Sequence, residues 1–168
     1  MKVLRGMKRI LVISDTHVVN LAALPKALVE DISGADIVVH CGDYTGIELL
    51  EELKDASKRF VGVYGNMDML DVRKEVPRKT AFEVEGKRIG VIHPYWGGDK
   101  AGIKARISKE FHGVDIILYG HTHDAGYETI DGICFLNPGQ SQSKSAEKIT
   151  AGIITVGPDT FDVEIKSY

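Results

Sequence analysis

Cysteine and long apolar runs are scarce in this chain. Its two cysteines, Cys41 and Cys134, are too few for a disulfide framework and form no Cys-x-x-Cys pair. We therefore expect a reducing, cytoplasmic setting. The N-terminal apolar run, residues 10–13, is shorter than the ~7–15 residues of a signal-peptide core or the ~20 residues of a membrane-spanning helix. We expect no membrane association.

Positive charge is also in short supply. Lysine and arginine number 21 against 24 aspartates and glutamates, for a net charge of −3, which argues against a broad nucleic-acid-binding surface. Repeats and low-complexity stretches are absent too, so we expect no disorder beyond the termini. A length of 168 residues suits one domain of the usual ~100–200 residues. We expect it to span 1–168, with 1–6 as a short extension and either Met1 or Met7 as the start.

What the chain does contain is an alternation of apolar runs and helical patterns. The sequence predicts strands at 9–14, 36–40, 59–64 and 114–120, helices at 24–33, 46–56 and 99–111, and a hairpin over 79–94. Beyond residue 120 the pattern is strand-like, with turns at Asp131-Gly132 and Gly157-Pro158. Early helices predict parallel crossovers and late hairpins predict antiparallel additions. We expect an α/β fold of mixed sheets covered by helices.

Polar residues collect where these apolar runs end. Five runs lead into segments rich in Asp, Asn and His: 14–17 (SDTH), 40–43 (HCGD), 65–68 (GNMD), 93–94 (HP) and 120–123 (GHTH). In such sheets ligands bind beyond the carboxyl ends of the strands. Residues i and i+2 of an extended segment point the same way, so Asp15 with His17, and His121 with His123, would each send two ligands into one pocket. The glycines beside them would allow sharp turns or a close approach of the backbone.

Seven of these residues have the chemistry of a metal site without sulfur: Asp15, His17, Asp43, Asn66, His93, His121 and His123. Seven ligands are too many for one tetrahedral ion and fit two divalent ions that share a carboxylate. Nitrogen and oxygen ligands suit Mn, Fe, Zn, Co or Ni. Two carboxylates against two divalent ions leave an excess of positive charge that would attract a phosphate ester. Ions ~3.5–4 Å apart would also lower the pKa of a bridging water.

In this order, DTH (15–17), GD (42–43), GN (65–66), a later single histidine and GHTH (120–123) resemble the motifs of the calcineurin-like metallophosphoesterases. The resemblance covers residues 10–139, and LNPG (136–139) is similar to the small-phosphodiesterase branch of the YfcE type. It implies two mixed β-sheets packed as a sandwich and flanked by helices. It also implies a phosphodiesterase that cleaves activated or cyclic phosphodiesters with two divalent ions, first of all Mn, with Ni, Zn, Fe or Co as alternatives.

The resemblance also implies roles for single residues. The first ion would be held by Asp15, His17, Asp43 and His123. The second would be held by Asp43, Asn66, His93 and His121, so that Asp43 bridges the two ions. Asp43, Asn66, His93 and Asp68 would take part in catalysis, and Asn66 and His93 would also contact the substrate.

The roles of three neighbouring residues stay open. Asp68 would either cap a helix over 69–76 or orient a ligand or water. Trp96 would either pack or stack on a base or aryl group at the pocket rim. Met67 stands where many relatives have a histidine that acts on the phosphate or the leaving group. Because methionine has no proton to give, we expect activated or strained diesters to be preferred over alkyl monoesters. His40 and His112 are expected to be ordinary hydrogen-bonded residues outside the site.

Two other functions stay open. The small retromer subunit resembles the same family and acts through protein contacts, although a carboxylate stands in it where this chain has Asn66. A nuclease on this fold would need a DNA-binding extension, for which the chain has little room. The expected partner is a small phosphate ester, and a homo-oligomer is compatible with the sequence.

Overall fold

Two five-stranded β-sheets form the centre of the fold in the computed structural model, which describes residues 6–95, 100–142 and 148–168. The first sheet has the strand order β10-β9-β1-β2-β3. Its strands are β1 (Lys8–Ile13), β2 (Ile37–His40), β3 (Phe60–Gly62), β9 (Thr150–Val156) and β10 (Phe161–Ser167). β1, β2 and β3 are parallel, whereas β9 is antiparallel to both of its neighbours. The predicted early parallel crossovers and late antiparallel additions are confirmed.

The second sheet has the strand order β4-β5-β6-β8-β7. Its strands are β4 (Lys79–Val84), β5 (Lys87–Ile92), β6 (Ile116–Tyr119), β7 (Gly126–Ile130) and β8 (Ile133–Asn137). The central three are parallel, and β4 and β7 are antiparallel edges. Both hairpin turns, at Glu85-Gly86 and Asp131-Gly132, have positive φ at their two central residues. This is the geometry that matches the twist of paired strands, and it confirms the hairpin predicted over 79–94 and the turn predicted at Asp131-Gly132.

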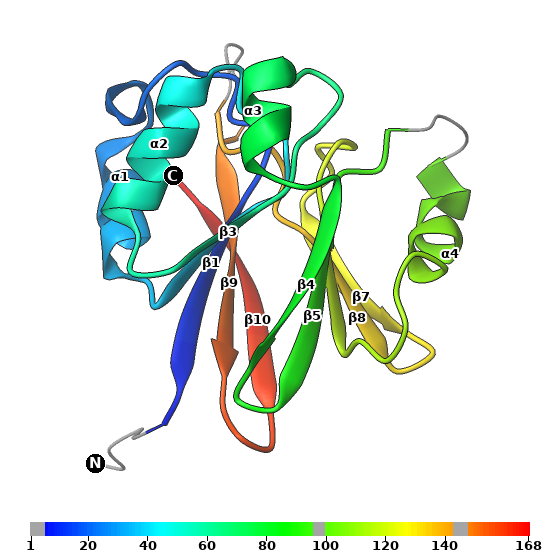
Figure 1. The fold of residues 1–168 in the computed structure, drawn as a ribbon. Helices are drawn as coiled ribbons and strands as arrows, with labels where there is room; N and C mark the ends of the chain where they lie inside the picture. Colours follow the sequence, from blue (N-terminus) through cyan, green and yellow to red (C-terminus); the bar gives the residue numbers. More distant parts are fainter. Residues whose placement is uncertain (1–5, 96–99, 143–147) are drawn as a thin grey trace.

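Helices cover the outer face of each sheet, so that the molecule has four layers (Figure 1). The helices are α1 (Lys26–Gly34), α2 (Ile47–Ala56), α3 (Leu70–Glu75) and α4 (Ile103–Ser108), with short 3-10 turns η1 (Leu21–Ala23) and η2 (Lys100–Gly102). α1 and α2 lie against the first sheet, α4 lies against the second, and α3 lies at one end of the sandwich (Figure 1). Within the described segments, no helix is long and apolar enough to cross a bilayer.

The alternation of side chains along the strands divides the core. Ile10 and Val12 of β1 pack between the two sheets, whereas Leu11 and Ile13 pack with the residues of α1 and α2. Ile117 of β6 packs in a third cluster with residues of α4. All five side chains are fully buried. A strand covered on both faces needs apolar residues at every position, which explains the uninterrupted apolar run that β1 shows in the sequence.

Three predicted elements differ in detail. The helix expected over 99–111 is α-helical only from Ile103, because η2 and Gly102 precede it and glycine disfavours a helix interior. Pro25 is the residue before the first turn of α1 rather than a member of that turn. The strand expected over 59–64 ends earlier, because the Tyr64 N–H bonds to the Pro77 carbonyl instead of continuing the sheet.

Candidate metal centre

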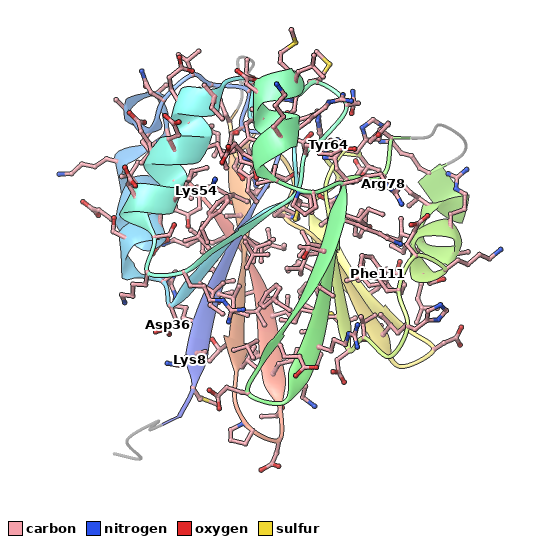
Figure 2. The ribbon with its side chains drawn as sticks, viewed as in Figure 1. Lys8, Asp36, Lys54, Tyr64, Arg78 and Phe111 are labelled. Carbon is pink, nitrogen blue, oxygen red and sulfur yellow. The ribbon has the colours of Figure 1, made fainter. Side chains whose placement is uncertain are left out.

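The polar segments meet at one end of the sandwich. β1, β2 and β3 of the first sheet and β5 and β6 of the second sheet all lead into this end with their carboxyl termini. Tyr64, which precedes the 65–68 turn, marks this end beside α3 in Figure 2, and the ion pair of Lys8 with Asp36 lies toward the opposite end. The two sheets therefore contribute side chains to one site from either side.

Asp15 is the centre of the first group of candidate ligands. Its Oδ1 lies 3.1 Å from His123 Nε2 and 3.9 Å from His17 Nε2. Its Oδ2 accepts hydrogen bonds from the Ser14 hydroxyl (2.5 Å) and from the His121 N–H (3.1 Å). Burial alone would raise the pKa of Asp15, but the hydrogen bond from His123 and the nearby His93 hold it below its ordinary value. Asp15 is therefore an ionised carboxylate with one oxygen fixed and the other facing histidines.

Asn66 and His93 are the centre of the second group. Asn66 Oδ1 lies 3.1 Å from His93 Nε2 and 3.1 Å from His121 Nδ1. The fully buried His93 donates from Nδ1 to the Cys41 carbonyl at 2.7 Å, which directs Nε2 toward the site. Burial alone would lower the pKa of His93, but the Asp43 and Asp15 carboxylates raise it above its ordinary value. The raised pKa means that the site favours a positive charge at His93. A divalent cation bound to Nε2 would supply that charge in place of a proton.

Asp43 connects the two groups. Its Oδ2 lies 3.4 Å from His93 Nε2 and 4.0 Å from His17 Nε2, so one carboxylate oxygen faces ligands of both groups. Its Oδ1 accepts the Met67 N–H at 2.8 Å. Burial tends to raise the pKa of Asp43, but the hydrogen bond and charge of His93 lower it overall. This position suits a carboxylate shared by two ions.

The charges of the site fit a cation. Asp15 and Asp43 are 0% and 3% exposed, and within the described residues their ion-pair partners are histidines, with no lysine or arginine among them. Two trios have ligand atoms close enough to share an ion, namely Asp15, His17 and His123, and Asp15, Asp43 and His93. Buried carboxylates require a compensating charge, and a divalent ion would supply it.

Asp68 does not cap α3. The residue before α3 is Met69, and no side chain caps that helix. Instead the Asp68 carboxylate accepts four backbone N–H groups, with Oδ2 bound to Asp43 (2.9 Å) and Gly65 (2.7 Å) and Oδ1 bound to Tyr44 (2.7 Å) and Thr45 (3.4 Å). Of the two roles left open by the sequence, capping is wrong. Asp68 joins the backbone of residues 43–45 to that of Gly65, and so connects the segments that carry the candidate ligands Asp43 and Asn66.

His40 is a buried residue that connects two of the segments at this end of the sandwich. It is fully buried, accepts the Gly42 N–H at Nδ1 (3.1 Å) and lies 2.9 Å from Thr16 Oγ1 through Nε2. Its ring stacks on Tyr44 with centroids 3.7 Å apart. Burial lowers its pKa to about 3, so it is neutral. The prediction that His40 is an ordinary hydrogen-bonded residue is confirmed, but its two bonds join the segments that carry Asp15 and Asp43.

The backbone of the candidate ligands is left-handed rather than extended. Five of the seven have positive φ: Asp15 (52°), His17 (46°), Asp43 (62°), His121 (76°) and His123 (61°). The prediction that i and i+2 lie on an extended segment is therefore wrong. His121 turns toward Asn66, while His123 turns toward Asp15. Non-glycine residues in this conformation persist only where neighbours hold them; here the Asp15 N–H bonds to Gly42 O and the His17 N–H bonds to Asp43 O.

Two glycines let the chain pass close to ligand carboxylates. A Cβ on Gly65 would lie 2.1 Å from Asp43 Oδ1, and one on Gly120 would lie 2.1 Å from Ser14 Oγ and 2.8 Å from Asp15 Oδ2. Real Cβ contacts are never this short, so any side chain would displace the carboxylates. The predicted close approach of the backbone is present. The groups that it approaches are the side chains of the candidate ligands Asp43 and Asp15 and of Ser14.

Trp96, for which a substrate-stacking role was considered, lies outside the described residues. Met67 is 59% exposed, and so are its neighbours Met69 (67%) and Leu70 (73%). His112 is exposed and belongs to neither group of candidate ligands, which agrees with its predicted place outside the site.

Known proteins resemble this chain over most of its length. A model of the calcineurin-like phosphoesterase superfamily domain matches residues 7–159. A probable metallophosphoesterase of Methanocaldococcus jannaschii is 43% identical over 141 residues, which cover 82% of this chain and 70% of the relative. A phosphodiesterase of the same organism is 25% identical over 169 residues and covers 94% of each chain. The structure of vacuolar protein sorting 29 from Cryptosporidium parvum has a TM-score of 0.75 at 19% identity, covering 97% and 98%, and shows the fold alone.

Proposed function

The chain belongs to the calcineurin-like phosphoesterase superfamily, and on this basis we propose that it is a phosphodiesterase that uses two divalent metal ions. The observation that carries the proposal is the pair of buried carboxylates, Asp15 and Asp43, whose ion-pair partners among the described residues are histidines only. Such a pair needs cations. Two divalent ions would leave the site positive enough to bind a phosphate ester.

The seven candidate ligands divide naturally between two ions. Asp15, His17 and His123 would hold one ion, Asn66, His93 and His121 would hold the other, and Asp43 would be shared. When bound, the ions would supply the Lewis acidity that acidifies a water molecule and offsets the charge of the phosphoryl oxygens. Mn is the first candidate for this oxygen- and nitrogen-rich set, with Ni, Zn, Fe and Co as alternatives.

The protein's own part is to hold these groups in place. His93 is oriented by the Cys41 carbonyl, and orientation of a ligand by its second nitrogen typically strengthens metal binding. Asn66 would supply an oxygen without cancelling positive charge. Asp68 acts as a positioning residue, because its four N–H contacts are all with backbone.

Met67 supports a proposal about the class of ester. Its N–H bonds to Asp43 and its side chain is exposed beside the site, where it offers no proton to a departing alkoxide. General acids are worth ~10²–10⁴ in rate. Phosphodiesters with good leaving groups, or strained cyclic ones, need this help least, which supports activated or cyclic diesters as substrates. The relative at 25% identity is named a phosphodiesterase, which supports diesters as the general class of substrate.

The test is a metal-screened hydrolysis assay. Metal-stripped protein is reloaded with Mn²⁺, Ni²⁺ or Zn²⁺ and assayed on bis(p-nitrophenyl) phosphate, p-nitrophenyl phosphate, and 2′,3′- and 3′,5′-cyclic nucleotides. We expect turnover of diesters that needs metal and is lost in Asp43→Asn. Equal activity of wild type and Asp43→Asn would refute the proposal. Stable capture of a protein partner without any turnover would favour a scaffold instead, and selective cleavage of DNA would favour a nuclease.

A further inference from the structure

A cavity of about 380 Å³ opens beside the candidate metal centre. It is lined by His17, Thr45, Met67, Gln140 and Gln142. We propose that this cavity binds the organic group of the substrate, and that this group is a neutral heteroaromatic ring with hydrogen-bonding edges, as in a nucleoside. The inference rests on the proposed function and names the class of ester that the site takes.

The cavity is continuous with the metal centre. His17 Nε2 lies 3.9 Å from Asp15 Oδ1 and 4.0 Å from Asp43 Oδ2, so one wall of the cavity is itself a candidate ligand. A second wall, Met67, is tied to the centre because its N–H donates to Asp43 Oδ1 at 2.8 Å. A group attached to a phosphate in the centre would therefore enter this cavity directly. The volume lies in the usual ~300–1,000 Å³ range of small-molecule sites.

The two glutamines are carried by a fixed piece of backbone. Ser141, between them, is fully buried. Its N–H donates to Ser14 O at 2.9 Å, its hydroxyl accepts the Ser14 N–H at 3.2 Å, and the same hydroxyl donates to Thr150 O at 2.9 Å. Ser14 immediately precedes Asp15. The hydrogen bonds between Ser14 and Ser141 therefore hold Gln140 and Gln142 in place relative to Asp15. Such preorganisation favours binding.

The chemistry of the lining selects the occupant. The described lining residues include no lysine, arginine, aspartate or glutamate, so neither a second phosphate nor a quaternary amine finds an oppositely charged side chain of these types among them. Gln140 and Gln142 are carboxamides, which carry both N–H donors and a carbonyl acceptor, the chemistry that the edge of a base requires; Gln142 Nε2 also donates to the Ala23 carbonyl at 3.4 Å. The thioether of Met67 packs favourably on aromatic faces. A plain alkyl group would use neither property.

Thr45 adds an independent sign that the cavity is functional. Its φ is 102°, in the left-handed range, although it is β-branched and exposed. Such a conformation is costly and rare for this residue type, and it is found where ligands are clamped. It is maintained by the contact of its N–H with Asp68 Oδ1 (3.4 Å) and by a bridge to Val18.

The test measures binding, so that it does not depend on turnover. Protein loaded with Mn²⁺ is titrated calorimetrically with adenosine 5′-monophosphate, methyl phosphate, phosphorylcholine and inorganic phosphate. We expect the nucleotide to bind at least about tenfold more tightly than methyl phosphate or phosphorylcholine. Met67→Ala and Gln140→Ala should each reduce this preference about three- to tenfold. The matched control is Met69→Ala, since Met69 is 67% exposed and does not line the cavity; it should keep the wild-type preference.

The outcomes separate the two proposals. If inorganic phosphate and methyl phosphate bind but the nucleotide binds no better, the cavity does not select a base and the inference is wrong. The same holds if phosphorylcholine binds best, or if Met67→Ala and Met69→Ala behave alike. If none of the four anions binds the loaded protein, the proposed function fails as well. Met67 and Met69 are exposed and Gln140 is half-buried, so we expect all three variants to fold, and melting temperatures within a few degrees of wild type would show this.

Discussion

Replacing Asp68 by asparagine should loosen the turn that carries Asn66 and weaken metal binding without touching a ligand. Each oxygen of the Asp68 carboxylate accepts two backbone N–H groups. Asparagine keeps one acceptor oxygen and presents an NH₂ group in place of the other. If the remaining oxygen stays with Asp43 and Gly65, the N–H groups of Tyr44 and Thr45 face a donor.

The cost follows from these contacts. A hydrogen bond to a charged group contributes ~1.5–3 kcal/mol, and a buried donor left unpaired costs ~1–3 kcal/mol. The Tyr44 bond (2.7 Å) is buried and lost in full, whereas the Thr45 bond is long (3.4 Å) and contributes little. Removing a buried charge returns part of the loss. We expect the free energy of unfolding to fall by about 2–4 kcal/mol.

The assay combines urea unfolding of the metal-free protein with calorimetric titration of Mn²⁺. Asp68→Asn should lower the unfolding midpoint and reduce metal affinity at least about tenfold, within the range known for residues that orient ligands. The matched control is Asp71→Asn, which removes an exposed carboxylate from the first turn of α3 and should cost only ~0.3–1 kcal/mol. Equal stability losses in the two variants, with unchanged metal affinity in both, would refute the positioning role of Asp68.

Three further predictions concern the site and the scaffold. Met67→His should raise kcat/KM for diesters with alkyl leaving groups by up to ~10² and change aryl diesters little; an equal change in both series would show that residue 67 is not placed to protonate the leaving group. Gly65→Ala should reduce the metal content per chain, because its Cβ would lie 2.1 Å from Asp43 Oδ1; unchanged content by elemental analysis would contradict the close approach. Burial alone would raise the pKa of Asp31, but hydrogen bonds, first that of Lys166, lower it overall. Asp31→Asn should therefore cost ~1–3 kcal/mol at pH 7, and the difference from wild type should shrink as the pH falls below about 4; a difference independent of pH in urea unfolding would argue against an ionised Asp31.

Much of the fold could be predicted because its physical causes are local. The turn at Asp131-Gly132 follows from a residue pair that tolerates positive φ, and β1 and β2 follow from apolar runs buried on two faces. The helix over 99–111 was predicted too long, because a pattern of apolar spacing does not show where a glycine interrupts a weak helix. The end of β3 was missed because it depends on Pro77, a partner distant in the sequence.

The chemical types of the candidate ligands can be read directly from the order of residues in the chain. Asp, Asn and His at the ends of successive apolar runs specify oxygen and nitrogen ligands, since parallel strands bring their ends to one edge of a sheet. How those ligands are held becomes visible only in the folded protein. Left-handed turns direct His121 and His123 to different groups, and Asp68 binds backbone on both sides of the site rather than capping α3. The fold also brings Gln140 and Met67 to one cavity from distant parts of the chain. These features depend on contacts between residues that are far apart in the chain. The spacing of residues along the sequence does not show which of these contacts form.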